Sequence, residues 1–252
     1  MAIEPAGSNA PRAIILAAGR GSRMQRLTDE RPKCLVELRG TALLDLQVRA
    51  LRAEGIRQIG IVTGYKRELL TDRGLTEFHN PRWAETNMVS SLACAESWLL
   101  EGTCIVSYGD IFYDSSAVRL LLNCQAPLAV TYDGNWLASW RERFEDPLVD
   151  AETFRLKPDG SLREIGNKPG SIEEIEGQYM GLLRFTPAAW QEVDRVRGGL
   201  TPRERDSMHM TGTLQKIIEA GRMPVHAVRY DRPWGEVDSP SDLSRYEARP
   251  GS

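Results

Sequence analysis

Short apolar runs alternate with longer amphipathic segments along the first half of the chain. The run at residues 13–16 ends in a glycine-rich turn, as expected of a buried strand. Comparable runs and helical spacings follow at short intervals, and Gly55 gives the first helix a stop signal. We predict strands at 13–16, 58–63, 104–107 and 128–132, with helices at 43–53 and 90–100 between them. Such alternation favours right-handed crossovers and therefore an α/β fold with a doubly wound, mostly parallel, Rossmann-like sheet.

The pattern changes after Asp150. Two strand-like segments flank Asp159-Gly160, a dipeptide typical of a β-hairpin. Because no repeat or long linker interrupts the chain, we predict a single domain at 12–248 with a small antiparallel insertion within about 132–210, after a flexible leader at 1–11. We predict later strands at 153–157, 161–165, 180–185 and 224–230, and helices at 187–196 and 210–220.

Composition and charge narrow the classes of partner. The chain has 252 residues, 41% of them hydrophobic and 27% charged, which is ordinary for a soluble globular protein. A formal net charge of −3 argues against a general nucleic-acid binder, which would need a basic face. The sequence offers neither a secretory signal nor an apolar window of the roughly 20 residues that a membrane span requires. We therefore expect a cytoplasmic protein with no nucleic-acid or membrane partner.

Cysteine and histidine usage limits the possible metals. The four cysteines and three histidines are scattered, so a disulfide framework and a structural zinc site are both disfavoured. Any metal must then be held by carboxylates, which favours Mg²⁺ as the cofactor.

A glycine-rich segment, LAAGRGSRM at residues 16–24, directly follows the first predicted strand. Gly19 and Gly21 allow a tight turn that can present backbone N–H groups to a phosphate. A dinucleotide fingerprint would have a third glycine where Met24 stands, and a Walker A loop would contain Gly-Lys-Ser/Thr, which is absent. The remaining interpretations are a different phosphate loop and a plain strand-to-helix turn.

Basic residues favour the phosphate loop. Arg20 and Arg23 lie within it, and Lys33 follows in the segment Pro-Lys-Cys-Leu at 32–35. A lone lysine is usually solvated surface, but one placed behind such a loop is a candidate phosphate ligand.

Two groups of carboxylates are candidate metal ligands. Asp110 follows the strand at 104–107, and open α/β sheets bind ligands at the carboxyl ends of their strands. Glu236 and Asp238 would share one face of an extended segment. Each aspartate also has an ordinary interpretation, because Asp110 could cap a helix that starts near Ser115 and Asp238 could cap the last helix.

The motif L-A-A-G-x-G-S-R-M, followed by R-P-K-C-L-V, resembles the signature of the nucleotidyltransferase superfamily that activates sugar phosphates, phosphocholine and related acceptors. The resemblance extends from Arg12 to about Tyr246. It implies catalytic roles for Lys33 and Arg23, and magnesium ligation by Asp110 and Asp238 with Glu236 nearby. It also implies nucleotide contacts from Leu16, Ala17, Ala18, Gly19, Arg20, Gly21, Ser22, Arg23, Lys33, Asn87, Ser91, Gly109 and Asp110.

The stretch at 135–152 mixes aromatic, arginine and carboxylate side chains. This mixture suits a ligand with an amino group at one end and a phosphorus oxyanion at the other, although the tryptophans could also be core and the acids solvated. With the segments at 86–91, 164–168 and 176–182, it resembles bacterial CTP-dependent phosphocholine and phosphonate cytidylyltransferases, including relatives that act on a phosphorylated amino acid. We therefore expect CTP and a small phosphonate or phosphate acceptor as substrates. The candidate acceptor ligands are Trp136, Arg143, Asp146, Asp150, Glu152, Lys168, Glu176 and Tyr179.

The sequence also leaves two other functions open. One is a sugar-1-phosphate nucleotidyltransferase that uses UTP, dTTP or GTP, and the other is a nucleotide-sensing scaffold without turnover. Retention of the glycine loop, Lys33, Asp110 and Asp238 together disfavours the scaffold. A homodimer is a further possibility that the sequence does not decide.

Overall fold

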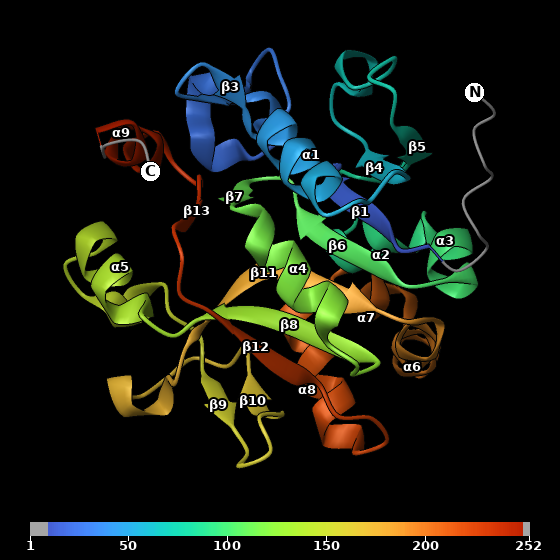
Figure 1. Ribbon diagram of the computed structural model, residues 1–252, viewed down its shortest axis with the longest axis vertical. Coiled ribbons are helices and arrows are strands. Elements are labelled where there is room, and N and C mark those ends of the chain that lie inside the picture. The colour runs from blue at the N-terminus through green and yellow to red at the C-terminus, as the bar shows by residue number, and fades with distance from the viewer. Residues whose placement is uncertain (1–9, 249–252) are drawn as a thin grey trace.

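A seven-stranded sheet forms the centre of the protein in the computed structural model, which describes residues 10–248 (Figure 1). β11 runs antiparallel to both of its neighbours, β6 and β8, whereas the other neighbouring strands of this sheet are parallel. The predicted mostly parallel sheet is therefore confirmed. In spatial order the strands are β12 (His226–Tyr230), β8 (Leu128–Asp133), β11 (Gln178–Phe185), β6 (Cys104–Tyr108), β1 (Arg12–Ala17), β4 (Ile59–Thr63) and β5 (Thr76–His79).

Helices cover both faces of this sheet, as a doubly wound fold requires. Along β1, Ile14 packs into one core while Ala13 and Ile15 pack into the other, which is the alternation expected of a strand buried on both faces. One face carries α1 (Leu43–Ala53) and α4 (Ser115–Asn123). The opposite face carries α2 (Met88–Ala93), α3 (Glu96–Glu101), α6 (Pro187–Gly198) and α8 (Met210–Ala220).

The predicted strands of the central sheet match observed strands to within two residues at each end, but one predicted helix is wrong. Residues 90–100 form two short helices, α2 and α3, because the backbone at Ala95 leaves the helical region (φ −100°, ψ 21°). Asn87 fixes the earlier start of α2, since its side chain accepts a hydrogen bond from the N–H of Met88. Leu92 of α2 and Leu99 of α3 both pack into the core on this face of the sheet.

Shorter strands and helices lie outside the central sheet. The predicted hairpin is present as β9 (Phe154–Leu156) and β10 (Leu162–Ile165), which pair antiparallel. The other short elements are η1 (Ser22–Thr28), η2 (Lys33–Leu35), β2 (Glu37–Leu38), β3 (Thr41–Ala42), η3 (Arg67–Leu69), α5 (Trp136–Arg143), η4 (Pro147–Val149), η5 (Ile172–Glu174) and α7 (Pro202–Asp206).

The C-terminal segment returns to the N-terminal part of the fold. β13 (Trp234–Glu236) pairs antiparallel with β7 (Ile111–Tyr113), the strand that follows β6. α9 (Pro240–Ala248) then packs against β2 and η1 (Figure 1). This return places residues 236–238 beside the end of β6 and the glycine loop.

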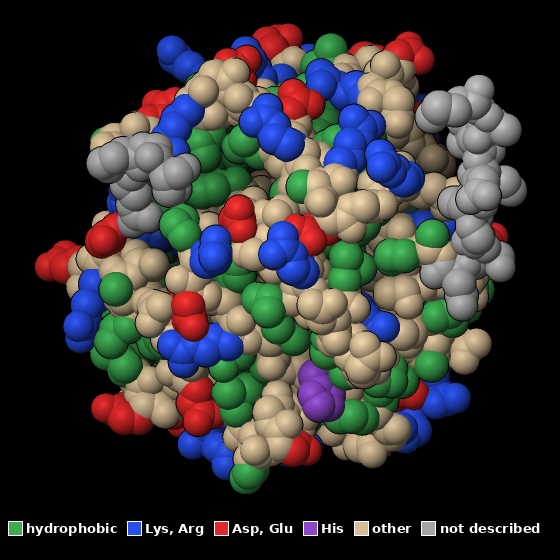
Figure 2. All heavy atoms as spheres, in the orientation of Figure 1, with side chains coloured by type: hydrophobic (Ala, Val, Ile, Leu, Met, Phe, Trp, Pro, Cys, Tyr) green, Lys and Arg blue, Asp and Glu red, His purple; other side chains and the backbone are tan. Residues whose placement is uncertain are grey.

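Most of the predicted leader, residues 1–9, lies outside the described residues, and the single-domain assignment stays a prediction. None of the described helices has the length and hydropathy needed to cross a membrane. Acidic and basic side chains are interspersed with apolar ones over the face shown in Figure 2.

Candidate active site

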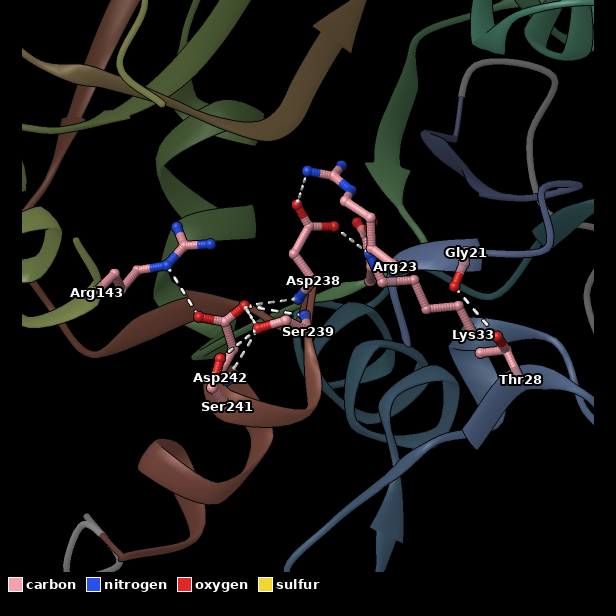
Figure 3. Close-up of polar contacts among 10 residues, drawn as sticks. Gly21, Arg23, Thr28, Lys33, Arg143, Asp238, Ser239, Ser241 and Asp242 are labelled. Carbon is pink, nitrogen blue, oxygen red and sulfur yellow. Dashed lines mark hydrogen bonds and ion pairs between the residues drawn. The ribbon is translucent and has the colours of Figure 1, made fainter. Parts of the chain in front are cut away.

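The glycine loop folds over Lys33. Gly21 has a positive φ of 71°, and a Cβ atom at this position would lie only 2.7 Å from Cδ of Lys33. Glycine is therefore required here by the backbone and by the close approach of the lysine. The hydroxyl of Thr28 donates a hydrogen bond of 3.1 Å to the Gly21 carbonyl and closes the loop (Figure 3).

Lys33 lies between two of the predicted metal ligands. Its Nζ is 2.8 Å from Oδ2 of Asp110 and also forms an ion pair with Asp238, whose other oxygen is 2.7 Å from Nη1 of Arg23 (Figure 3). Lys33 is only 8% exposed. Burial acts to lower the pKa of Lys33, but the carboxylates of Asp110 and Asp238 outweigh it and raise the pKa above its ordinary value. The ammonium is therefore firmly charged.

Three carboxylates converge at this point. Ligand atoms of Asp110, Glu236 and Asp238 all lie within 4.8 Å of one another. The pairing of β7 with β13 creates this cluster, because it sets Glu236 opposite Ile111. Burial, followed by the neighbouring aspartates, raises the pKa of Glu236 to about 8.

The cluster fits a hard divalent cation. Its donors are carboxylate oxygens, and Oδ1 of Asp110 is buried without a hydrogen-bond partner among the described residues. The alternative in which Asp110 caps a helix is excluded, because Asp114 caps α4 by accepting a 3.0 Å hydrogen bond from the N–H of Ser116. The Asp238 carboxylate faces Lys33 and Arg23.

A cavity of about 330 Å³, here called the glycine-loop cavity, opens above the loop. Twelve of the thirteen predicted nucleotide-binding residues line it, from Leu16 in β1 to Asp110 after β6. Arg20 is the exception, because its guanidinium pairs with Asp29 at 2.6 Å. The cavity also has walls that the sequence analysis did not assign, formed by Cys34, Trp83, Thr86, Met88 and Tyr108.

A second cavity of about 280 Å³, here called the Tyr179 cavity, adjoins the first. The two cavities share Arg23 and Asp238, so the carboxylate cluster lies at their boundary. Of the predicted acceptor ligands, Asp150, Glu152 and Tyr179 line this second cavity. Its other lining residues include Trp140, Gln178, His209, Met210 and Thr211.

Several polar groups of the Tyr179 cavity lack a full set of partners. Among the described residues, the Tyr179 hydroxyl and the Trp140 indole N–H are buried with no hydrogen-bond partner. Burial raises the pKa of Glu152, and a weak 3.4 Å hydrogen bond from Thr211 opposes this shift. Groups of this kind favour a polar ligand, since an unmet hydrogen bond in a buried site is unfavourable.

The five other predicted acceptor ligands do not line this cavity, and two of them are held inside the fold. Trp136 is 4% exposed and donates its indole N–H to the Ile175 carbonyl at 3.2 Å, so it is a core residue. The Arg143 side chain is 5% exposed and its Nε lies 3.1 Å from Asp242 (Figure 3). Arg143 therefore anchors α9 to α5.

The remaining three have local or surface positions. Asp146 caps η4 by accepting a 2.9 Å hydrogen bond from the N–H of Leu148. Glu176 accepts a hydrogen bond from the N–H of Leu156, which fastens β9. Lys168 is exposed. These three residues therefore do not line the Tyr179 cavity.

His209 and Thr211 are the clearest omissions of the sequence analysis. Both lie at the start of α8, about sixty residues after the acidic stretch, and the Asn87 amide lies 3.1 Å from Nδ1 of His209. Polar residues at a helix start usually act as caps, so no local pattern singles them out. Their approach to the site depends on the packing of α8 against α2.

Comparison with known proteins agrees with this geometry. The MobA-like NTP transferase domain matches residues 13–183, and the chain therefore belongs to this family of nucleotidyltransferases. The CTP:phosphoglutamine cytidylyltransferase of Campylobacter jejuni is 36% identical over 251 residues, which cover 92% of this chain and 97% of that protein. The 2-aminoethylphosphonate cytidylyltransferase of Lancefieldella rimae is 35% identical over 112 residues, covering 42% of this chain and 46% of that protein.

Solved structures support the fold. The inositol-1-phosphate CTP transferase from T. maritima superposes with a TM-score of 0.74 at 20% identity, covering 96% of this chain and 95% of that one. The match to the family over residues 13–183 and the similarity to the Campylobacter jejuni protein confirm the predicted membership of the nucleotidyltransferase superfamily.

Proposed function

We propose that this protein is a cytidylyltransferase that transfers CMP from CTP to a small phosphorylated acceptor bearing an amino group, with phosphoglutamine as the favoured acceptor. The observation that carries the proposal is the position of Lys33, Asp110 and Asp238 at the boundary of two cavities. One cavity is lined by the glycine loop and the other by the carboxylates of Asp150 and Glu152. Similarity over nearly the whole length of a CTP:phosphoglutamine cytidylyltransferase supports the choice of substrates.

Asp110, Glu236 and Asp238 are the residues that would hold magnesium. A bound magnesium ion would supply positive charge against the phosphates of the nucleotide. The ammonium of Lys33 forms ion pairs with two of these carboxylates, so its positive charge also lies beside the proposed magnesium site.

The proposed reaction needs no protein nucleophile. An oxygen of the acceptor phosphoryl group attacks the α-phosphorus of CTP, and the bond from that phosphorus to the oxygen bridging the β-phosphate breaks. Pyrophosphate leaves with the bonding electrons. Because the attacking oxygen is already anionic near neutral pH, the protein acts by positioning and by stabilising charge. The N–H groups of the glycine loop, Lys33 and Arg23 supply this stabilisation.

Arg23 has a particular place in this scheme, because it lines both cavities. Its guanidinium can therefore contact the phosphoryl group of the acceptor as well as the α-phosphate. Two anionic groups that must approach each other repel, and a shared cation between them reduces that repulsion.

The Tyr179 cavity would hold the rest of the acceptor. Asp150 and Glu152 can pair with its ammonium group, which is otherwise unfavourable to bury. The Tyr179 hydroxyl and the Trp140 indole N–H can donate to a carboxylate or amide oxygen. A phosphorylated amino acid offers both kinds of group, whereas a hexose 1-phosphate has no cation for the two acids.

A pyrophosphate-release screen tests this proposal. Each of four NTPs would be combined with phosphoglutamine, 2-aminoethylphosphonate, phosphocholine and hexose 1-phosphates. We expect the highest rate with CTP and an acceptor that carries an amino or ammonium group. A preference for UTP, dTTP or GTP with a hexose 1-phosphate would instead establish a sugar-phosphate nucleotidyltransferase.

A further inference from the structure

A third cavity is bordered by Ser90 of α2 and is not lined by any of the three carboxylates of the cluster. It has a volume of about 340 Å³ and is called the arginine cavity here, because Arg82, Arg197 and Arg205 all line it. Arg197 belongs to α6 and Arg205 to α7, and α7 packs against α2. Among the described residues, Asp206 is the one acidic residue that lines the cavity with them. The proposed transfer reaction has no use for this cluster.

The charges in the arginine cavity are unevenly paired. Nη2 of Arg82 lies 2.7 Å from the Asp206 carboxylate, so the acidic residue of this lining is already paired with Arg82. Among residues 10–248, Arg197 and Arg205 form no ion pair within 4.0 Å. Nη1 of Arg197 and Nε of Arg205 are buried and have no hydrogen-bond partner in the described part of the chain. Two guanidinium groups thus carry buried donors without acceptors.

The Arg205 guanidinium also disfavours the charge of Arg197. Burial lowers the pKa of Arg197, and the nearby Arg205 adds to this shift, against the opposing effects of Asp194, Asp206 and Glu96. An anion between the two arginines would relieve the repulsion and satisfy the buried donors. Planar guanidinium groups present paired N–H donors that match the oxygens of a phosphate.

We propose that the arginine cavity binds a small phosphate-class oxyanion through Arg197 and Arg205. The site is separate from the one in which we place the nucleotide phosphates, and its existence does not depend on the proposed reaction.

Hydrogen bonds connect the lining of the arginine cavity to the lining of the glycine-loop cavity. The Asn80 amide, which lines the arginine cavity, donates to Thr86 at 3.0 Å and to Ser91 at 2.9 Å. Ser91 lines the glycine-loop cavity, and Thr86 lines both cavities. An oxyanion in the arginine cavity is therefore expected to alter nucleotide affinity, and the nucleotide to alter oxyanion affinity by the same factor. This second expectation rests on the proposed binding of CTP.

Calorimetric titration of inorganic phosphate into the nucleotide-free protein tests the site. Arg197→Gln and Arg205→Gln should each raise the Kd for phosphate by about 10-fold or more, the scale of losing a charge-assisted hydrogen bond. Arg203→Gln is the matched control, because this exposed arginine is also on α7 but does not line the cavity. Thermal unfolding of every variant checks that the fold is retained.

A parallel titration of Arg23→Gln separates the two possible phosphate sites. Binding that survives in Arg23→Gln but weakens in Arg205→Gln places the phosphate in the arginine cavity. Binding lost in Arg23→Gln and unchanged in Arg197→Gln and Arg205→Gln overturns the proposal, and so does the absence of any phosphate binding.

Titration of CTP with and without phosphate then tests the coupling. We expect phosphate to change the Kd for CTP in the wild type and not in Arg205→Gln. An unchanged Kd in the wild type would leave the oxyanion site in place and overturn its effect on the nucleotide. Failure of CTP to bind at all would contradict the proposed function without touching the phosphate result.

Discussion

The ammonium of Lys33 forms an ion pair with the carboxylate of Asp238, although the two residues are 205 positions apart in the chain. The contact joins the segment after the glycine loop to the segment after β13. It depends on the pairing of β7 with β13 and on the packing of α9 against β2 and η1. The charge of Lys33 is thereby held against the carboxylates that we propose as metal ligands.

Lys33→Ala tests the charge-stabilising role of the lysine. Removing its ammonium should lower kcat by about 100-fold or more, the scale of losing one group that stabilises a developing charge. Steady-state kinetics with CTP and acceptor varied separately would measure the effect. A change confined to the KM of the acceptor would place Lys33 outside the nucleotide chemistry.

Asp110→Ala and Asp238→Ala test the metal assignment. Each should reduce magnesium-dependent turnover by orders of magnitude, because the cluster would lose one of its three carboxylates. Rates measured across a magnesium titration would show the loss, with circular dichroism to check the fold. Asp231→Asn, at an exposed position, is the control. Near-normal turnover in Asp110→Ala would refute the assignment.

Asp150→Asn and Glu152→Gln test the recognition of the amino group. At least one of them should raise the KM of an amino-bearing acceptor by about 10-fold or more, since a buried ammonium would lose its counter-charge. The KM of CTP should change little. Asp146→Asn is the matched control, because Asp146 caps η4 and does not line the Tyr179 cavity. Silent replacements at both Asp150 and Glu152 would contradict an amino-bearing acceptor.

Tyr179→Phe tests whether the buried hydroxyl of Tyr179 binds the acceptor rather than stabilising the fold. The free energy of unfolding should stay the same or rise slightly, because the hydroxyl has no partner among the described residues. The KM of the acceptor should increase in the same variant. Denaturant unfolding and steady-state kinetics on one preparation would measure both. A loss of stability without a change in KM would make Tyr179 a structural residue.

The raised pKa of Asp194 predicts that the stability of the fold depends on pH. Burial and the neighbouring Glu96 carboxyl raise the pKa of Asp194 from its ordinary value of 3.8 to about 6. The folded state therefore binds more protons than the unfolded state between these two values, and this group makes the free energy of unfolding fall as pH rises through that window. Unfolding of Asp194→Asn at pH 4 to 7 should show a smaller fall than the wild type. Parallel profiles for the two proteins would contradict the shifted pKa.

The fold and the glycine-loop cavity were largely predictable from the sequence. Buried strands are continuous apolar runs, and the residues from Leu16 to Lys33 are near one another in the chain as well as in space. The direction of β11 was not predictable, because an antiparallel strand buried among parallel ones has the same apolar pattern as they have.

The Tyr179 cavity was only partly predictable for a related reason. Its walls come from α5, β11 and the start of α8, so Trp140, Gln178 and His209 converge only after the sheet has formed. Composition indicated an aromatic and acidic site. It could not distinguish Trp140, which lines the cavity, from Trp136 one helical turn earlier, which faces the core.

Mass spectrometry and ³¹P NMR of the product formed from CTP, magnesium and phosphoglutamine give the most direct test of the proposed cytidylyltransferase activity. We expect a compound in which CMP is joined to the acceptor phosphoryl group through a new P–O–P linkage, with one pyrophosphate released per product. Replacing phosphoglutamine with a hexose 1-phosphate should give little product. Efficient formation of a nucleoside diphosphate hexose, with no cytidylylated amino-bearing acceptor, would contradict the proposed cytidylyltransferase activity.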